Sequence, residues 1–247
     1  MFDAFRTLRG VLRSLRIYYG GKHDRSAMDQ LYARFVQPND LVFDVGSHVG
    51  DRIAAFRRLG CRVVACEPNP PLVKTLRLLY GRDAGVTIEP VAVGAAPGEI
   101  ELKINVDNPT VSTASRDFVK ASEGAPGWQV QVWDKSLRVA VTTLDALIAR
   151  HGIPAFIKID VEGFEAEALA GLTQAVPALS FEFTTIQRDV AHACLQRCAA
   201  LGYVRYNAAL GESQTLVHPD WQDAEAIARW LDGLPMEANS GDVYATR

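Results

Sequence analysis

The chain has little cysteine and no long apolar run. Four of its 247 residues are cysteines, and none stands in a C-x-x-C pair or near a histidine at the spacing of a zinc site. We therefore expect buried thiols rather than disulfides. No apolar run is long enough to span a bilayer, and arginines interrupt the first twenty residues. The sequence thus favours a cytoplasmic protein with neither a membrane-spanning helix nor a secretory signal.

Neither sign of charge is in clear excess. The formal net charge is −3 at pH 7 and 48% of the residues are hydrophobic, which excludes a disordered chain and argues against a nucleic-acid partner. The sequence also lacks a P-loop and a G-x-S-x-G elbow, so it gives no support to kinase or serine hydrolase chemistry. Its length suffices for one α/β domain with a buried core.

Short apolar runs alternate with helical patterns from residue 40 onward. The predicted strands lie near 41–45, 62–66, 86–93, 99–104, 155–161, 178–184, 203–209 and 241–246. The predicted helices lie near 50–59, 70–80, 143–151, 164–171, 189–201 and 222–231. Alternation of this kind is typical of a parallel sheet with crossover helices.

The stretch from 105 to 138 fits neither pattern. It is long and polar, and we predict that it forms an acceptor loop or lid. Its hydroxyl side chains are available to hydrogen-bond an acceptor; they include Ser112, Thr113 and Ser115. Its two tryptophans, Trp128 and Trp133, either stack on a sugar ring or pack against protein, and both alternatives stay open.

Residues 1–20 have the pattern of an amphipathic helix. Apolar side chains recur at three- and four-residue steps, at Phe2, Phe5, Leu8, Leu12, Leu15 and Tyr19. Arginines form a separate stripe, at Arg6, Arg9, Arg13 and Arg16. Three roles fit this pattern: packing on the domain or on the second subunit of a homodimer, attachment to an anionic membrane, and contact with an acidic acceptor. We predict packing, with the arginines solvated.

A cofactor-binding turn is indicated after the first predicted strand. Asp44 lies in that strand, and Gly46 and Gly50 follow where the chain turns into a helix. The dinucleotide pattern G-x-G-x-x-G lacks its middle glycine here, and an acid beside the turn is unfavourable for a pyrophosphate. Glu67 follows the second strand, where it is placed to accept ribose hydroxyls. This combination favours S-adenosylmethionine over NAD.

Three charged residues, Lys158, Asp160 and Glu162, alternate with apolar ones along the strand predicted at 155–161. Alternate side chains of a strand share a face, so the three charges are expected to lie together. Such a row either closes into a salt-bridge network or serves a site, because isolated buried charges are costly. Glu182, on the next strand, is a second acid, a partner of Lys158, or a ligand in an oxygen-rich metal site.

Five motifs together resemble those of the FkbM-type methyltransferases. They are D-V-G-S-H-V-G at 44–50, E-P-N at 67–69, V-A-V-G at 91–94, T-T-L-D at 142–145 and I-K-I-D-V-E-G at 157–163. The resemblance covers roughly residues 40 to 185, and its last motif is the most specific. His48 stands where the family often has Asn. The resemblance implies S-adenosylmethionine-dependent methyl transfer, usually to an oxygen of a polyketide, sugar or glycan.

We therefore predict an α/β, doubly wound, mostly parallel seven-stranded sheet of the Rossmann-like methyltransferase class over 39–247, preceded by a helical extension over 1–38. The predicted cofactor-binding residues are Asp44, Gly46, Ser47, His48, Gly50, Glu67, Pro68, Asn69, Ala92, Val93 and Asp160. The predicted catalytic residues are Asp160, Lys158, Glu162, Glu182 and His48. We expect a small-molecule or glycan acceptor and no metal. The alternatives are an NAD-dependent sugar or polyol oxidoreductase and a non-catalytic interaction protein with a cofactor fold.

Overall fold

The computed structural model describes residues 2–20 and 25–247. Met1 and residues 21–24 of the predicted N-terminal extension lie outside the described residues, and so do the side chains of 2–4 and 25. The apolar position predicted at Phe2 therefore has no structural outcome here.

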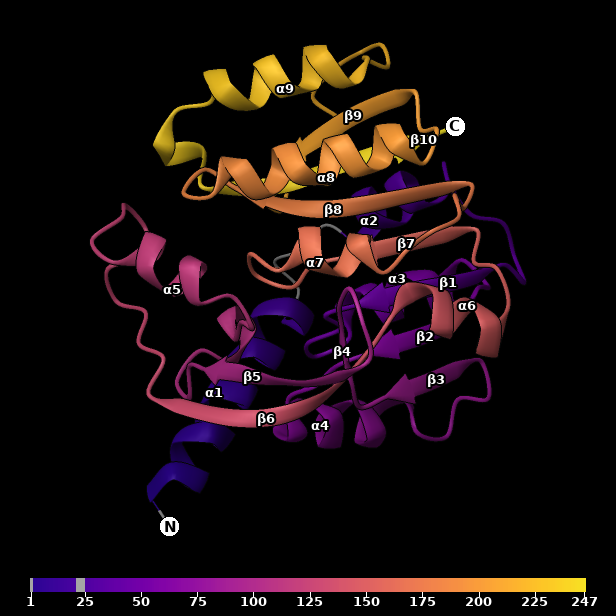
Figure 1. Cartoon of the computed structure of the whole chain (residues 1–247). Helices are drawn as coiled ribbons and strands as arrows, with labels where there is room; N and C mark the ends of the chain where they lie inside the picture. Colours follow the sequence, from indigo (N-terminus) through magenta and orange to yellow (C-terminus); the bar gives the residue numbers. More distant parts are fainter. Residues whose placement is uncertain (1, 21–24) are drawn as a thin grey trace.

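A seven-stranded sheet forms the centre of the molecule, in the order β3-β2-β1-β7-β8-β10-β9 (Figure 1). Its strands are β1 (Leu41–Val45), β2 (Arg62–Cys66), β3 (Val86–Glu89), β7 (Phe156–Ile159), β8 (Ala178–Thr184), β9 (Arg205–Leu210) and β10 (Ser240–Thr246). The neighbours among β3, β2, β1, β7 and β8 pair in parallel, and β10 pairs antiparallel with both β8 and β9. The mostly parallel, seven-stranded fold predicted from the sequence is confirmed.

Helices cover both faces of this sheet. They are α2 (Arg25–Tyr32), α3 (Asp51–Arg58) and α4 (Pro70–Tyr80) on one face, and α6 (Leu144–His151), α7 (Glu165–Ala170), α8 (Arg188–Ala200) and α9 (Ala224–Gly233) on the other. Strand alternation divides the core accordingly: Leu41, Phe43 and Val45 belong to the cluster under α6–α9, and Val42 belongs to the cluster under α2–α4. The four cysteines are buried and free, as predicted.

A second, three-stranded sheet stands beside the first, in the order β4-β6-β5. Its strands are β4 (Ala92–Val93), β5 (Gly98–Ile104) and β6 (Lys135–Thr142). The single strand predicted at 86–93 is thus wrong, because the chain leaves the main sheet around Pro90, whose missing N–H cannot join a ladder. The prediction also missed β6, although Leu137, Val139 and Val141 alternate along it and pack in the core of the second sheet, because its first half falls in the segment predicted as a loop at 105–138.

The segment 105–138 contains the 3-10 turn η1 (Pro109–Val111), α5 (Arg116–Ser122) and the start of β6, and so is not one long loop. Its tryptophans pack against protein. Trp128 lies edge-on to Phe118 and donates its indole N–H to Asn239 at 2.9 Å. Trp133 donates to the backbone carbonyl of Val111 at 2.7 Å. Of the two roles left open by the sequence, these contacts support packing rather than stacking on a sugar.

Helix α1 (Phe2–Tyr19) lies against η1 and α4 and divides its apolar stripe between two environments. Of the predicted stripe, Leu15 and Tyr19 pack in a cluster with buried Val11, whereas Phe5, Leu8 and Leu12 are 68%, 56% and 55% exposed. The predicted packing of the α1 apolar stripe is therefore only partly realised.

The arginine stripe of α1 departs from the prediction as well. Arg6 forms ion pairs with Asp107 and Asp134, and Arg9 pairs with Asp107. The expectation that the arginines of this stripe are all solvated is thus wrong.

None of the helices in the described ranges combines the length and the apolarity that crossing a bilayer requires. A second 3-10 turn, η2 (Met236–Ala238), precedes β10.

Candidate cofactor and acceptor site

The turn between β1 and α3 passes very close to the end of β7. Gly46 has φ +86°, and a Cβ at this position would lie 1.7 Å from the backbone oxygen of Asp160. Only glycine fits both the left-handed conformation and this contact. The turn is also tied to β2, since the N–H groups of Gly46 and Ser47 donate to the carbonyl of Cys66 at 2.9 and 3.1 Å. The Gly-rich turn is therefore fixed between two strand ends.

Glu67 directly follows β2 and is 5% exposed. One of its carboxylate oxygens accepts a hydrogen bond from the N–H of His48 at 2.9 Å, and the other accepts from the N–H of Asn69 at 2.8 Å. Each oxygen keeps a further lone pair for a ligand. Burial raises the pKa of Glu67 to about 7, although the two N–H donors act in the opposite direction. The carboxylate is thus rigidly oriented and close to half ionised near neutral pH.

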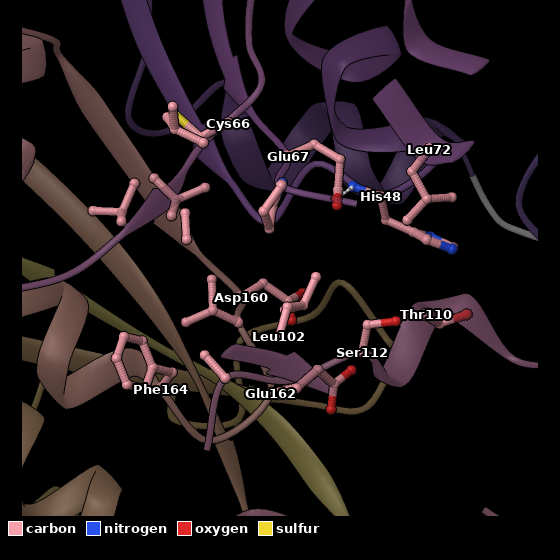
Figure 2. Close-up of a pocket in the computed structure, with 18 of the residues that line it drawn as sticks. His48, Cys66, Glu67, Leu72, Leu102, Thr110, Ser112, Asp160, Glu162 and Phe164 are labelled. Carbon is pink, nitrogen blue, oxygen red and sulfur yellow. Dashed lines mark hydrogen bonds between the residues drawn. The ribbon is translucent and has the colours of Figure 1, made fainter. Parts of the chain in front are cut away.

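A cleft with about 570 Å³ of empty volume lies at the carboxyl ends of β1, β2 and β7. Figure 2 shows Glu67 and His48 on one side of it and Asp160 and Glu162 on the other. Of the predicted cofactor-binding residues it is lined by Gly46, His48, Glu67, Pro68, Ala92, Val93 and Asp160. It is also lined by residues that the sequence did not single out for cofactor binding, among them Leu72, Leu102, Thr110, Ser112 and Phe164. Gly50 and Asn69 are not on its lining; Asn69 acts through Glu67.

A second cavity, which we call the acidic pocket, adjoins this cleft and has about 530 Å³ of empty volume. The two share Gly46, His48, Thr110, Asp160 and Glu162. The remaining lining residues of the acidic pocket are Tyr18, Asp44, Ser47, Asp51, Arg52, Glu182 and Glu212. Among them Tyr18, Asp51, Arg52 and Glu212 are new, since no motif or spacing in the sequence relates them to the site.

Lys158 lies beneath the acidic pocket and lines neither cavity. Its side chain is 1% exposed, and its Nζ pairs with Asp160 Oδ2 at 3.1 Å and with Asp242 Oδ1 at 2.6 Å. Glu182 is not among its ion-pair partners in the described chain, so that alternative is not realised. Burial acts to lower the pKa of Lys158, but the two aspartates outweigh it and hold the pKa well above its usual value. Lys158 is therefore positioned to orient Asp160 rather than to touch a substrate.

Asp160 remains ionised in this environment. Burial by itself would raise its pKa, but Lys158 and Arg52 outweigh burial and hold the pKa below its usual value. Glu182, by contrast, has a pKa raised well above its usual value by burial and by the charge of Asp160. The pKa values of these two neighbouring acids are thus shifted in opposite directions.

Glu162 does not lie on the strand, contrary to the same-face argument. β7 ends at Ile159, and Glu162 sits in a turn with φ +55°. Glu165 holds that turn by accepting the N–H groups of Val161 and Gly163 at 2.9 and 3.2 Å. The turn rather than the strand alternation directs Glu162 to the cavities.

His48 also has a positive φ, +48°, and its ring lies edge-on to Tyr18 with centroids 5.3 Å apart. Burial lowers the pKa of His48 to about 4, so the imidazole is neutral at pH 7. Basicity does not separate His48 from Asp160, because the pKa of Asp160 also lies below its usual value, and both side chains border the two cavities. What favours Asp160 for accepting a hydroxyl proton is its negative charge.

The hydroxyl groups predicted for an acceptor are largely engaged within the protein. Thr113 is fully buried and donates to the carbonyl of Glu162 at 2.6 Å. Ser115 caps α5 by accepting the N–H of Phe118. Ser112 reaches the cleft, although its hydroxyl donates to Pro109 at 2.9 Å. The prediction that all three meet an acceptor is wrong for Thr113 and Ser115.

A family model for the methyltransferase FkbM domain matches residues 44–218. The chain belongs to this family. As an FkbM methyltransferase, it is 26% identical over 156 residues to a curated relative, the hexuronic acid methyltransferase AglP of Haloferax volcanii. That match covers 62% of this chain and 59% of the relative, so the chain spans little more than half the length of the protein it matches.

Two solved structures are similar to this FkbM methyltransferase. A TehB-like SAM-dependent methyltransferase from Corynebacterium glutamicum matches with a TM-score of 0.50 at 11% identity, over 96% of this chain and 95% of that one. A SAM-dependent O-methyltransferase from Thermotoga maritima matches with a TM-score of 0.44 at 12% identity, over 91% of this chain and 64% of that one. The first supports the Rossmann-like methyltransferase fold.

Proposed function

We propose that this FkbM methyltransferase transfers a methyl group from S-adenosylmethionine to a hydroxyl oxygen of a carbohydrate. The observation that carries the proposal is the Glu67 carboxylate, held by two backbone N–H groups at the wall of a cleft that also borders Asp160. A buried, oriented carboxylate after the second strand is suited to two adjacent ribose hydroxyls.

The residues of the cleft fit this cofactor. Glu67 would take the ribose, and the side chains of Ala92 and Val93 are small and apolar enough to lie against a flat adenine. Gly46 allows the turn to approach the backbone oxygen of Asp160, so that both residues border the cleft. When bound, the sulfonium supplies an electrophilic methyl group.

The acceptor side is served by Asp160, which borders both cavities. In this proposal Asp160 accepts a hydrogen bond from the acceptor hydroxyl and takes its proton as the oxygen attacks. Lys158 keeps the carboxylate oriented and ionised. Since the curated relative is a hexuronic acid methyltransferase, we propose a sugar hydroxyl, free or in a glycan, as the acceptor. The identity and position of that hydroxyl are left to experiment.

Calorimetry with S-adenosylhomocysteine and NAD, followed by mass spectrometry of sugar and uronic acid glycosides incubated with S-adenosylmethionine, tests the proposal. We expect micromolar binding of S-adenosylhomocysteine and no binding of NAD. We also expect the acceptor to gain the mass of one methyl group. Mild ester hydrolysis should leave this methyl group in place, because it removes only a methyl group carried by a carboxyl. Absence of S-adenosylhomocysteine binding would overturn the cofactor assignment. A product that loses its methyl group on ester hydrolysis would overturn the hydroxyl assignment.

A further inference from the structure

Three carboxylates from different segments converge in the acidic pocket. Asp160 follows β7, Glu162 lies in the turn after it, and Glu182 lies on β8. Each offers an oxygen, and these three oxygens all lie within 4.8 Å of one another. Oxygen ligands of Mg²⁺ or Ca²⁺ lie about 2.0–2.6 Å from the ion, so ligands on opposite sides of one ion are about 4–5 Å apart. The spacing of the three carboxylates therefore matches a shared ion.

The cations around the pocket pair with only one of these three carboxylates, Asp160. Arg52 pairs with Asp51 and with Glu212, and Lys158 is shared by Asp160 and Asp242. Glu162 and Glu182 each keep a buried oxygen, Oε2, without a hydrogen-bond partner among the described residues.

A fourth carboxylate, outside the cluster, points to the same conclusion. Asp44 lies at the end of β1, opposite Lys158 in the strand register, and lines the acidic pocket. It is 1% exposed, and its Oδ2 is buried without a hydrogen-bond partner in the described chain. A buried carboxylate oxygen without a donor is costly. The pocket thus contains more carboxyl groups than Arg52 and Lys158 can pair with.

We propose that Asp160, Glu162 and Glu182 bind a divalent cation in the acidic pocket, although the sequence led us to expect no metal. Ligands that are all carboxylates favour hard cations, Mg²⁺, Mn²⁺ or Ca²⁺, over zinc or copper. The proposal adds to the proposed function an ion beside the acceptor hydroxyl, because Asp160 and Glu162 also line the cofactor cleft. A sugar hydroxyl or carboxylate that coordinates this ion is bound without repulsion from the acidic wall.

Direct Mn²⁺ binding to the 247-residue chain, first treated with EDTA and dialysed, tests the site without reference to activity. Electron paramagnetic resonance titration is expected to show one bound Mn²⁺ per chain. Glu162→Gln and Glu182→Gln are expected to weaken it at least about tenfold. The matched control is Glu212→Gln, which removes a charge from the same wall but from a residue paired with Arg52; binding is expected to change less than about threefold.

Two results would overturn the proposal. One is the absence of bound Mn²⁺ at millimolar concentration, or an Mn²⁺ affinity equal to that of the wild type in both glutamine variants. Circular dichroism checks that each variant is folded, and Glu182→Asp is used if Glu182→Gln is not. The other is competition between Mn²⁺ and S-adenosylhomocysteine, which would assign the pocket to the ammonium group of the cofactor. The direct Mn²⁺ titration contains neither cofactor nor acceptor. Its result therefore stands even if the methyl transfer proposed above is not found.

Discussion

The cofactor cleft and the acidic pocket share a wall but are assembled in different ways. Glu67 and the Gly46 turn of the cleft belong to short motifs that follow consecutive strands, β1 and β2. The acidic pocket combines Tyr18, Arg52 and Glu212, which are distant in the sequence and have no common spacing. Local motifs thus determine one cavity and tertiary packing the other. Variants that affect one cavity but not the other test this difference.

The largest effect is expected from Lys158→Met, beneath the acidic pocket. The change leaves Asp160 and Asp242 without their buried counter-charge, which typically costs about 3–5 kcal/mol of unfolding free energy. Urea unfolding measures it. Lys103→Met is the control, since Lys103 pairs with Glu101 near the surface and such a pair contributes about 1 kcal/mol or less. Equal losses in the two variants would contradict the structural role of Lys158.

Asp160→Asn follows, with an expected loss of at least about 100-fold in turnover. Cofactor affinity is expected to change only a few fold, because the Glu67 side of the cleft is unaffected. Steady-state kinetics and calorimetry separate the two effects. If turnover persists within a few fold, Asp160 is not the proton acceptor.

Glu67→Ala acts on the cleft alone. Charge-assisted hydrogen bonds to two hydroxyls contribute about 2 kcal/mol, so we expect cofactor binding to weaken by tens of fold without unfolding. Calorimetry with S-adenosylhomocysteine measures this, and Glu67→Gln, which keeps the size of the side chain, is the companion variant. Unchanged affinity in both would remove Glu67 from the ribose site.

The raised pKa of Glu67, about 7, predicts a pH dependence of cofactor binding. If ionised Glu67 binds the ribose, affinity rises about tenfold from pH 6 to pH 8 as the carboxyl loses its proton. In the free protein the sign is opposite: a carboxyl whose pKa is raised by folding stabilises the folded state at pH 5 and loses this contribution as the pH rises through about 7. Both trends are expected to be weaker in Glu67→Gln, and a wild-type affinity independent of pH would contradict the assignment.

The smallest effect concerns α1, where adjacent residues provide a matched pair. Val11 is 7% exposed and Leu12 is 55% exposed. Val11→Ala is expected to cost about 1–2 kcal/mol of unfolding free energy, and Leu12→Ala less than about 0.5 kcal/mol. Deletion of residues 1–20 is likewise expected to lower stability. The membrane alternative would instead be supported by two results together. Neither the Val11 variant nor the deletion would change stability, and the deletion would abolish sedimentation with anionic vesicles.

The sequence predicted the part of the site that short motifs determine. β1 and β2 were located to the residue because each is an apolar run between a turn and a helix. Glu162 was expected on a strand because sequence alternation continues through it, whereas the contacts of Glu165 with the turn become visible only in three dimensions.

Other parts depend on the order of the strands. Asp242 reaches Lys158 because β10 inserts antiparallel between β8 and β9 and lies opposite Glu182 in register. No spacing along the chain indicates that insertion. The partners of Trp128 and Trp133 are equally non-local, and so the sequence left their role open.

The close contact between Gly46 and Asp160 has a mechanical consequence. With no room for even a methyl group between them, and with the N–H of Asp160 bonded to the carbonyl of Val45 at 2.9 Å, the turn and the carboxylate move as one body. In-line displacement tolerates errors of only about half an ångström in the positions of the reacting groups. In the proposed reaction, this single backbone contact between the cofactor-side turn and Asp160 would meet that tolerance through stiffness, before any segment closes over the site.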